Sequence, residues 1–114
     1  MTIHLDEDIF EIVDKGVKNI EVRINDEKRR KLKIGDTLTF LKRPLEEESI
    51  KAVVTDLKYY DNFETLVENN DIERLYKKDY TKEDFIKLLE RFYTKEEQEK
   101  YGVVAIHFEK SDEV

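Results

Sequence analysis

A chain of 114 residues with no cysteine and a net charge of −7 at pH 7 excludes a disulfide framework and a thiolate metal site. Apolar residues make up 39% and charged residues 43% of the chain, and six Phe with six Tyr argue against wholesale disorder. With no signal-peptide pattern and no apolar run near the roughly 18 residues of a membrane span, we expect one cytoplasmic domain over residues 1–114, with no membrane, metal or cofactor bound.

The first predicted element is a helix over residues 5–15. Its apolar positions follow the spacing of one buried helical stripe: Leu5, Ile9, Ile12 and Val13. Gly16 is expected to end it, because glycine adopts the left-handed conformation of a helix C-terminus at little cost.

A half-buried strand is predicted over residues 18–24. Its β-branched residues recur at every second position, which places the intervening Glu21 and Arg23 together on the other face. Lys18 lies at the start of this strand. Polar groups of both signs on one strand face are typical of a small recognition site.

Further strands are predicted over residues 37–41 and 50–57, the first of them entered by the turn Gly35-Asp36. Between the first strand and that turn, residues 26–33 read as a polar connection with a turn of helix. A loop around Pro44 separates the other two strands.

The second half is mainly helical over residues 62–100. Three helix starts carry capping signals, namely Asp61-Asn-Phe-Glu64, Thr81-Lys-Glu-Asp84 and Thr94-Lys-Glu-Glu97. A closing strand over 102–108 is apolar on both faces and is therefore expected to be central. The tail 111–114 is expected to fray.

This order of elements predicts an α+β fold, with a small closed or nearly closed antiparallel barrel and helices outside it. We expect one shared core, made of Ile20, Val22, Ile24, Leu38, Phe40, Val54, Val104 and Ile106.

Three stretches together resemble the ASCH domain, a family of the PUA-like superfamily. They are Gly16-Val-Lys-Asn-Ile-Glu-Val-Arg23, Leu32-Lys-Ile-Gly-Asp-Thr-Leu-Thr-Phe40 and Tyr101-Gly-Val-Val-Ala-Ile106. The resemblance implies a small PUA-like β-barrel with flanking helices and a helical insertion before the last strand. It also implies RNA or nucleotide binding in a cleft between barrel and helices, with Lys18, Glu21 and Arg23 in that cleft.

Some small members of the family are similar to amidohydrolases that act on acetylated cytidine with a lysine, a threonine and a glutamate of the insertion. Lys18 matches the lysine, Glu21 stands at the position of the threonine, and residues 76–79 offer no match for the glutamate. Because two of these three residues are not matched, the resemblance does not favour an enzyme. Lys18 is the one catalytic candidate if the hydrolase interpretation holds.

The charge of the chain is unevenly distributed. Residues 15–43 contain ten Lys and Arg against four Asp and Glu, a net charge of +6, while the rest carries −13. The basic side chains that follow the 16–23 stretch most closely are Lys28, Arg29, Arg30, Lys31 and Lys33. They are candidates for phosphate contacts at the rim of the cleft, and the alternative is that they form a solvated loop. Tyr59 and Tyr60 are candidates for stacking on a base, with core packing as the alternative.

Three functions remain open at this point. The first is a module that binds single-stranded RNA or a nucleotide-like ligand, which the basic sector favours. The second is the amide-cleaving hydrolase, and the third is a protein-interaction or regulatory domain without nucleic acid. The sequence does not decide the ligand, the base preference or the oligomeric state.

Overall fold

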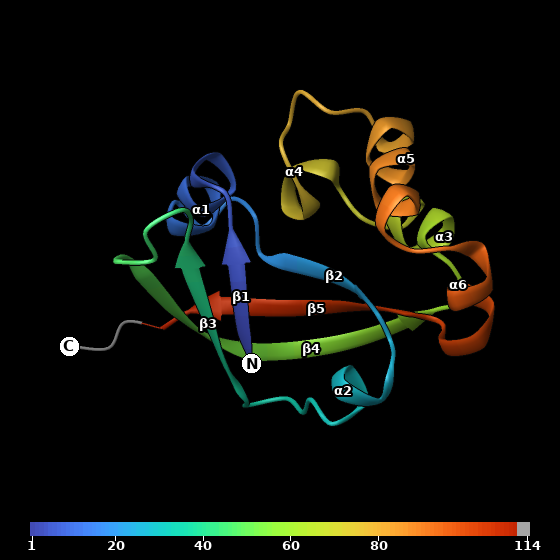
Figure 1. Cartoon of the computed structure of the whole chain (residues 1–114), viewed down its shortest axis with the longest axis horizontal. Coiled ribbons are helices and arrows are strands. Elements are labelled where there is room, and N and C mark those ends of the chain that lie inside the picture. The colour runs from blue at the N-terminus through green and yellow to red at the C-terminus, as the bar shows by residue number, and fades with distance from the viewer. Residues whose placement is uncertain (112–114) are drawn as a thin grey trace.

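The computed structural model describes residues 1–111, which form a five-stranded sheet and six helices (Figure 1). Residues 112–114, most of the tail expected to fray, lie outside this range. The strands are β1 (Thr2–Leu5), β2 (Ile20–Ile24), β3 (Thr37–Lys42), β4 (Ser49–Tyr60) and β5 (Val103–Lys110). The helices are α1 (Glu7–Asp14), α2 (Glu27–Arg30), α3 (Phe63–Glu68), α4 (Ile72–Leu75), α5 (Lys82–Phe92) and α6 (Lys95–Tyr101).

The sheet has the strand order β1-β3-β4-β5-β2 and curls into a half-barrel (Figure 1). β4 is the long strand that joins the two halves, because it pairs with β3 through its first part and with β5 through its second. Its pairing with β5 shifts register between Val54 and Asp56, and such a bulge bends a strand and increases its twist. β1 and β2 are the edges of this sheet, so the barrel stays open between them.

The start of the chain differs from the predicted helix over 5–15. Residues 2–5 form an edge strand that pairs in parallel with β3, and the helix begins only at Glu7. Leu5 fits the helical spacing, but it also alternates with the buried Ile3 along β1. Every other neighbouring pair in the sheet is antiparallel.

The apolar residues form two layers, not the one shared core that was predicted. Inside the curl, Phe40 packs with Leu38, Val54, Val104 and Ile106, and α1 closes this layer at one end. On the other face of the sheet, β2 contributes Ile20, Val22 and Ile24. These side chains, together with alternate residues of β5, pack against α3 and α5. β5 contributes to both layers, as its apolar faces predicted.

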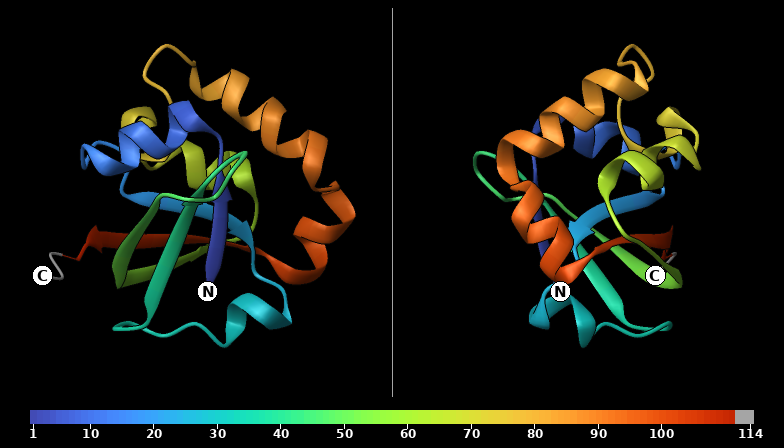
Figure 2. Two further views of the ribbon diagram at one scale, coloured as in Figure 1. Left: turned by 60° about the vertical axis from the view of Figure 1, so that its left-hand side comes forward. Right: turned by 90° about the vertical axis from the view of Figure 1, so that its right-hand side faces the viewer.

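The helical insertion between β4 and β5 lies outside the sheet, as predicted (Figure 2). Thr81 caps α5, and Thr94 with Glu97 forms a complete capping box at the start of α6. The cap of α3 is Asn62, one residue later than the predicted Asp61, and its side chain accepts a hydrogen bond from the backbone of Thr65. Within residues 1–111, none of the helices has the length and apolar composition that a membrane span requires.

Candidate functional site

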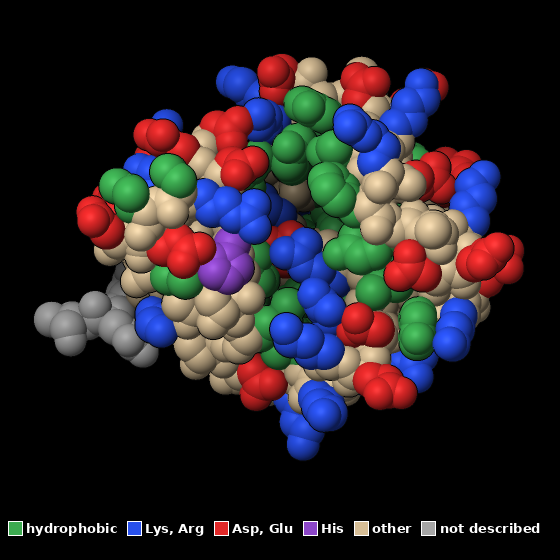
Figure 3. All heavy atoms as spheres, in the orientation of Figure 1, with side chains coloured by type: hydrophobic (Ala, Val, Ile, Leu, Met, Phe, Trp, Pro, Cys, Tyr) green, Lys and Arg blue, Asp and Glu red, His purple; other side chains and the backbone are tan. Residues whose placement is uncertain are grey.

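A cleft of about 680 Å³ opens where the curled sheet fails to close, and we call it the main cleft. Both edge strands line it, β1 on one side and β2 on the other, and α4 and α5 cover it from the insertion. On the face seen in Figure 3, a band of Lys and Arg side chains crosses the middle of the molecule, with hydrophobic side chains between it and the helices.

β2 places its polar residues in this cleft because of its alternation. Ile20, Val22 and Ile24 turn toward the helices, so Glu21 and Arg23 turn toward the inside of the curl. The predicted parity is therefore right, but the polar face looks into the half-barrel and not toward open solvent. Glu21 is buried, at 6% exposure, and Arg23 is half-buried.

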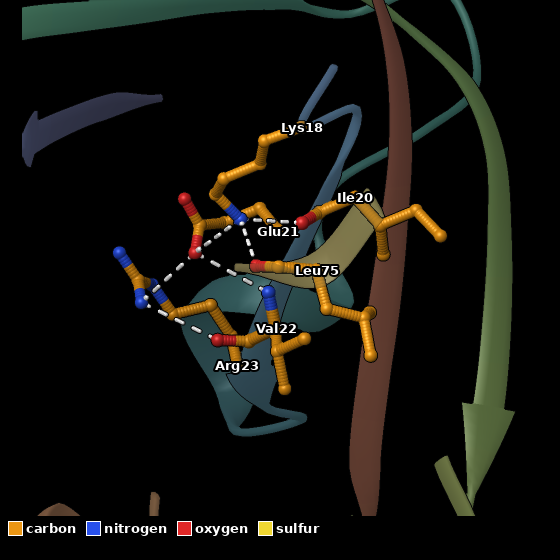
Figure 4. Close-up of polar contacts among 6 residues, drawn as sticks. All are labelled: Lys18, Ile20, Glu21, Val22, Arg23 and Leu75. Carbon is orange, nitrogen blue, oxygen red and sulfur yellow. Dashed lines mark hydrogen bonds and ion pairs between the residues drawn. The ribbon is translucent and has the colours of Figure 1, made fainter. Parts of the chain in front are cut away.

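Lys18 lies at the floor of the main cleft and is 3% exposed. Its Nζ donates to the carbonyl oxygens of Ile20, at 2.5 Å, and Leu75, at 2.8 Å (Figure 4). The Oε1 atom of Glu21 lies 3.9 Å from the same ammonium. Lys18 therefore joins the start of β2 to the end of α4, and two of its three N–H donors are already used.

Glu21 stands between two cations. Its Oε1 lies 3.4 Å from Nη1 of Arg23 and accepts a 3.3 Å hydrogen bond from the backbone N–H of Val22 (Figure 4). Its Oε2 is buried and has no hydrogen-bond partner within residues 1–111. An unpartnered buried oxygen costs about 1–3 kcal/mol, so this atom favours any ligand that brings a donor.

The electrostatics of the three side chains follow from this geometry. Burial lowers the pKa of Lys18, although Glu21 opposes that effect. Burial alone would raise the pKa of Glu21, but the charges of Arg23 and Lys18 outweigh it and the pKa is lowered. The carboxylate of Glu21 in turn raises the pKa of Arg23. Glu21 is thus held ionised as an acceptor at neutral pH.

Further cations stand at the rim of the main cleft. Lys28 and Arg29 come from α2, whose start is fixed by the side chain of Asp26: this carboxylate accepts from the backbone N–H of Arg29 and from its Nη1, at 3.0 Å. Arg43, just after β3, lines the opposite side. Its Nη1 lies 3.8 Å from Oδ1 of Asp6, which lines the same side. The rim therefore carries cations on both sides, with Arg43 paired to a carboxylate.

The wall of the main cleft that the insertion provides is apolar. It comes from one face of α5 and the residues beside it, and consists of Phe85, Leu88, Leu89, Phe92 and Tyr93. Phe92 is 73% exposed, so most of its surface is open to a ligand. A flat ring could lie against this wall.

The other predicted site residues lie elsewhere. Arg30 sits outside the main cleft, with its guanidinium over the ring of Tyr101, and Lys31 and Lys33 are exposed beyond α2. A four-residue helix turns successive side chains in different directions, so only part of the basic run reaches the cleft. Tyr59 and Tyr60 line a second cleft at the far end of β4, and so do not adjoin Lys18.

Sequence reasoning missed the contribution of β1, of Arg43 and of the α5 wall to this cleft. The alternation of Ile3 and Leu5 with polar residues was a usable signal for β1. Arg43 carries no such signal, because nothing local distinguishes it from other exposed cations.

The insertion brings no carboxylate to the main cleft. Among residues 1–111, its lining from α4 onward consists of Leu75 and Tyr76 and the apolar wall. No three His, Asp or Glu side chains of the described chain come close enough together to hold a metal ion.

The curled sheet, the insertion before its last strand and the cleft between its edges define a PUA-like fold. The chain belongs to the ASCH domain family, whose model matches residues 3–112. Similar solved structures include the following two. Hypothetical protein PH0355 is 34% identical over 96% of this chain and 97% of its own, with a TM-score of 0.83. Protein PF0455 from Pyrococcus furiosus is 31% identical over 99% of this chain and 100% of its own, with a TM-score of 0.75. A search of the curated proteins gave no match.

Proposed function

We propose that this chain is a binding module for a short single-stranded segment of RNA, or a nucleotide of the same chemistry, held in the main cleft. The observation that carries the proposal is the unpartnered Oε2 of Glu21 at the bottom of a cleft whose rim is cationic. A nucleotide offers a phosphate for the rim and a donor-bearing base for the carboxylate.

The rim suits phosphate. Arg23, Lys28, Arg29 and Arg43 line one opening from three separate parts of the chain. Arginine presents a planar fork of donors that matches phosphate oxygens, and lysine adds a point charge. The net charge of −7 opposes long polyanions, so we expect weak binding of short strands.

The apolar wall suits a base. Leu88 and Phe92 line the same cleft as Glu21, and base stacking on an aromatic side chain contributes about 1–3 kcal/mol. A base against this wall can turn an exocyclic amine toward Oε2 of Glu21. Carboxylates accept from the amine of cytosine, and uracil has a carbonyl oxygen at that place.

The experiment is a titration of the purified protein with labelled hexamers of cytidine and of uridine, followed by fluorescence anisotropy. We expect the cytidine hexamer to bind about fivefold more tightly, the value of one such hydrogen bond. Glu21→Gln should reduce this ratio toward one without changing the salt dependence, because Glu21 faces a donor and not a phosphate. Equal binding of both hexamers by the unchanged protein would contradict the role of Glu21.

The two other functions predict different results. The hydrolase predicts multiple turnovers on acetylated cytidine that Lys18→Ala abolishes. Lys18 already donates to two carbonyls, and the insertion places no carboxylate of the described residues in the cleft, so the geometry favours binding. A protein-interaction domain predicts neither turnover nor salt-sensitive RNA binding.

A further inference from the structure

A second cleft of about 750 Å³ lies at the far end of β4, between the ends of β2 and β5 and the helices α3, α5 and α6. Among the residues that the structure describes, it shares none of its lining with the main cleft. We propose that this second cleft binds a lysine-bearing peptide segment of a partner protein. The proposal is independent of RNA binding in the main cleft.

The charge of the second cleft is opposite to that of the first. Four carboxylates line it, from the turn after β4 and from three helices: Asp61, Glu64, Glu90 and Glu99. Among the described residues, the one cation in its lining is Lys95. Such a surface attracts a cation and repels a phosphate, so it disfavours nucleic acid.

Two unpartnered polar atoms point to the rest of the ligand. Gln98 is 3% exposed, and its Oε1 accepts a 3.0 Å hydrogen bond from the backbone N–H of Phe63. This bond fixes the orientation of the amide and leaves Nε2 as a buried donor without a partner within residues 1–111. In the same lining, Oδ1 of Asn25 is a buried acceptor that also lacks a partner there.

A free donor and a free acceptor in one cleft match a peptide group. The carbonyl oxygen of a peptide can accept from Nε2 of Gln98, and a peptide N–H can donate to Oδ1 of Asn25. A protonated polyamine offers donors alone and would leave Gln98 unpaired. The amide pair therefore favours a peptide over a simple polycation.

Tyrosines complete the site for a lysine side chain. Tyr59 is 57% exposed and Tyr60 is half-buried, and both line the cleft. An ammonium over the face of a tyrosine is attracted by the electron-rich ring. The methylene stem of a lysine can lie along such a ring while its ammonium reaches Glu64 or Glu90.

The test is a titration of the isotopically labelled protein, followed by the NMR resonances of the side-chain amides. The probes are an acetylated and amidated Gly-Lys-Gly-Lys-Gly peptide, its counterpart with Gln at both Lys positions, and spermidine. We expect the lysyl peptide to shift the Nε2 resonances of Gln98 saturably. Spermidine should leave these resonances in place, and the glutaminyl peptide should bind at least fivefold more weakly.

Variants locate the site. Glu64→Gln and Glu90→Gln should each lower the affinity for the lysyl peptide by about two- to fivefold, which is the range for one exposed ion pair. Glu73→Gln removes an exposed carboxylate of α4 outside both clefts and should change nothing.

Three outcomes would overturn the proposal. One is a lysyl peptide that leaves the Gln98 resonances unmoved. Another is an equal loss of affinity in the Glu73, Glu64 and Glu90 variants, which would mean that the overall negative charge of the protein attracts the peptide without a specific site. The third is displacement of the peptide from Gln98 by the cytidine hexamer. Failure of RNA binding in the main cleft would touch none of these readouts.

Discussion

Nζ of Lys18 donates to the carbonyl oxygen of Leu75 at 2.8 Å, across 57 residues of sequence. The bond ties the start of β2 to the last residue of α4, and both partners are buried. Lys18 is therefore a structural link between the sheet and the insertion.

Replacing Lys18 with methionine should lower the free energy of unfolding by about 3 kcal/mol, because it leaves two buried carbonyls and part of the Glu21 charge unpaired. Urea denaturation measures this change. Lys15→Met, at an exposed position a few residues earlier, serves as the control and should cost less than about 0.5 kcal/mol. A cost under about 1 kcal/mol at Lys18 would contradict the buried geometry.

The Glu21 carboxylate predicts a pH dependence of stability. Its pKa in the folded state lies below its ordinary value of 4.5, so its contribution is complete above that value and is lost as pH falls through the folded pKa. Glu21→Gln should therefore have a lower free energy of unfolding than the unchanged protein at pH 7. This difference in free energy, the gap between the two proteins, should narrow below about pH 4.5. Urea titrations at pH 7, 5, 4 and 3 measure it. A gap that stays constant over this range would show that the carboxylate gains nothing from its cations.

Phe40 tests the inner layer of the sheet. It is fully buried, and its ring centroid lies 4.9 Å from that of Phe108. Phe40→Ala should cost about 3–5 kcal/mol in thermal or urea denaturation. Phe92→Ala removes an exposed ring of the same size and should cost less than about 0.5 kcal/mol. Similar losses at both positions would contradict this packing.

The salt dependence of RNA binding tests which part of the basic run touches phosphate. Two or three contacts to a single strand give a slope of log affinity against log salt of about −1.4 to −2.1. Lys28→Ala, at the rim of the main cleft, should flatten this slope by up to about 0.7. Lys31→Ala, in the same run but outside the cleft lining, is the matched control and should leave it unchanged. A flatter slope for Lys31→Ala and an unchanged slope for Lys28→Ala would place the RNA strand outside the main cleft.

Local patterns were sufficient for most elements of the fold. Caps at Thr81 and Thr94 located helix starts within a residue, since capping depends on nearby backbone groups. The two apolar faces of the last strand gave its central place. β1 was missed because Leu5 satisfies both the helical and the strand spacing, and the choice between them depends on its distant partner β3.

The site was predictable in part. Strand parity correctly placed Glu21 beside Arg23, but it could not tell which face of β2 meets the helices. The burial of Glu21 and the bonds of Lys18 depend on α4, which lies over 50 residues away. Ligand binding by these residues and a cytoplasmic location stay predictions.

β2 has one hydrogen-bonded neighbour in the sheet, and that neighbour is β5, with Ile20 opposite His107. During synthesis on the ribosome, more than two thirds of the chain must therefore be made after β2 before its partner β5 emerges. Such distant pairing is slow, and it leaves an apolar strand uncovered in the meantime. The main cleft therefore cannot form until β5 is in place beside β2, so the binding proposed for this cleft requires the completed sheet.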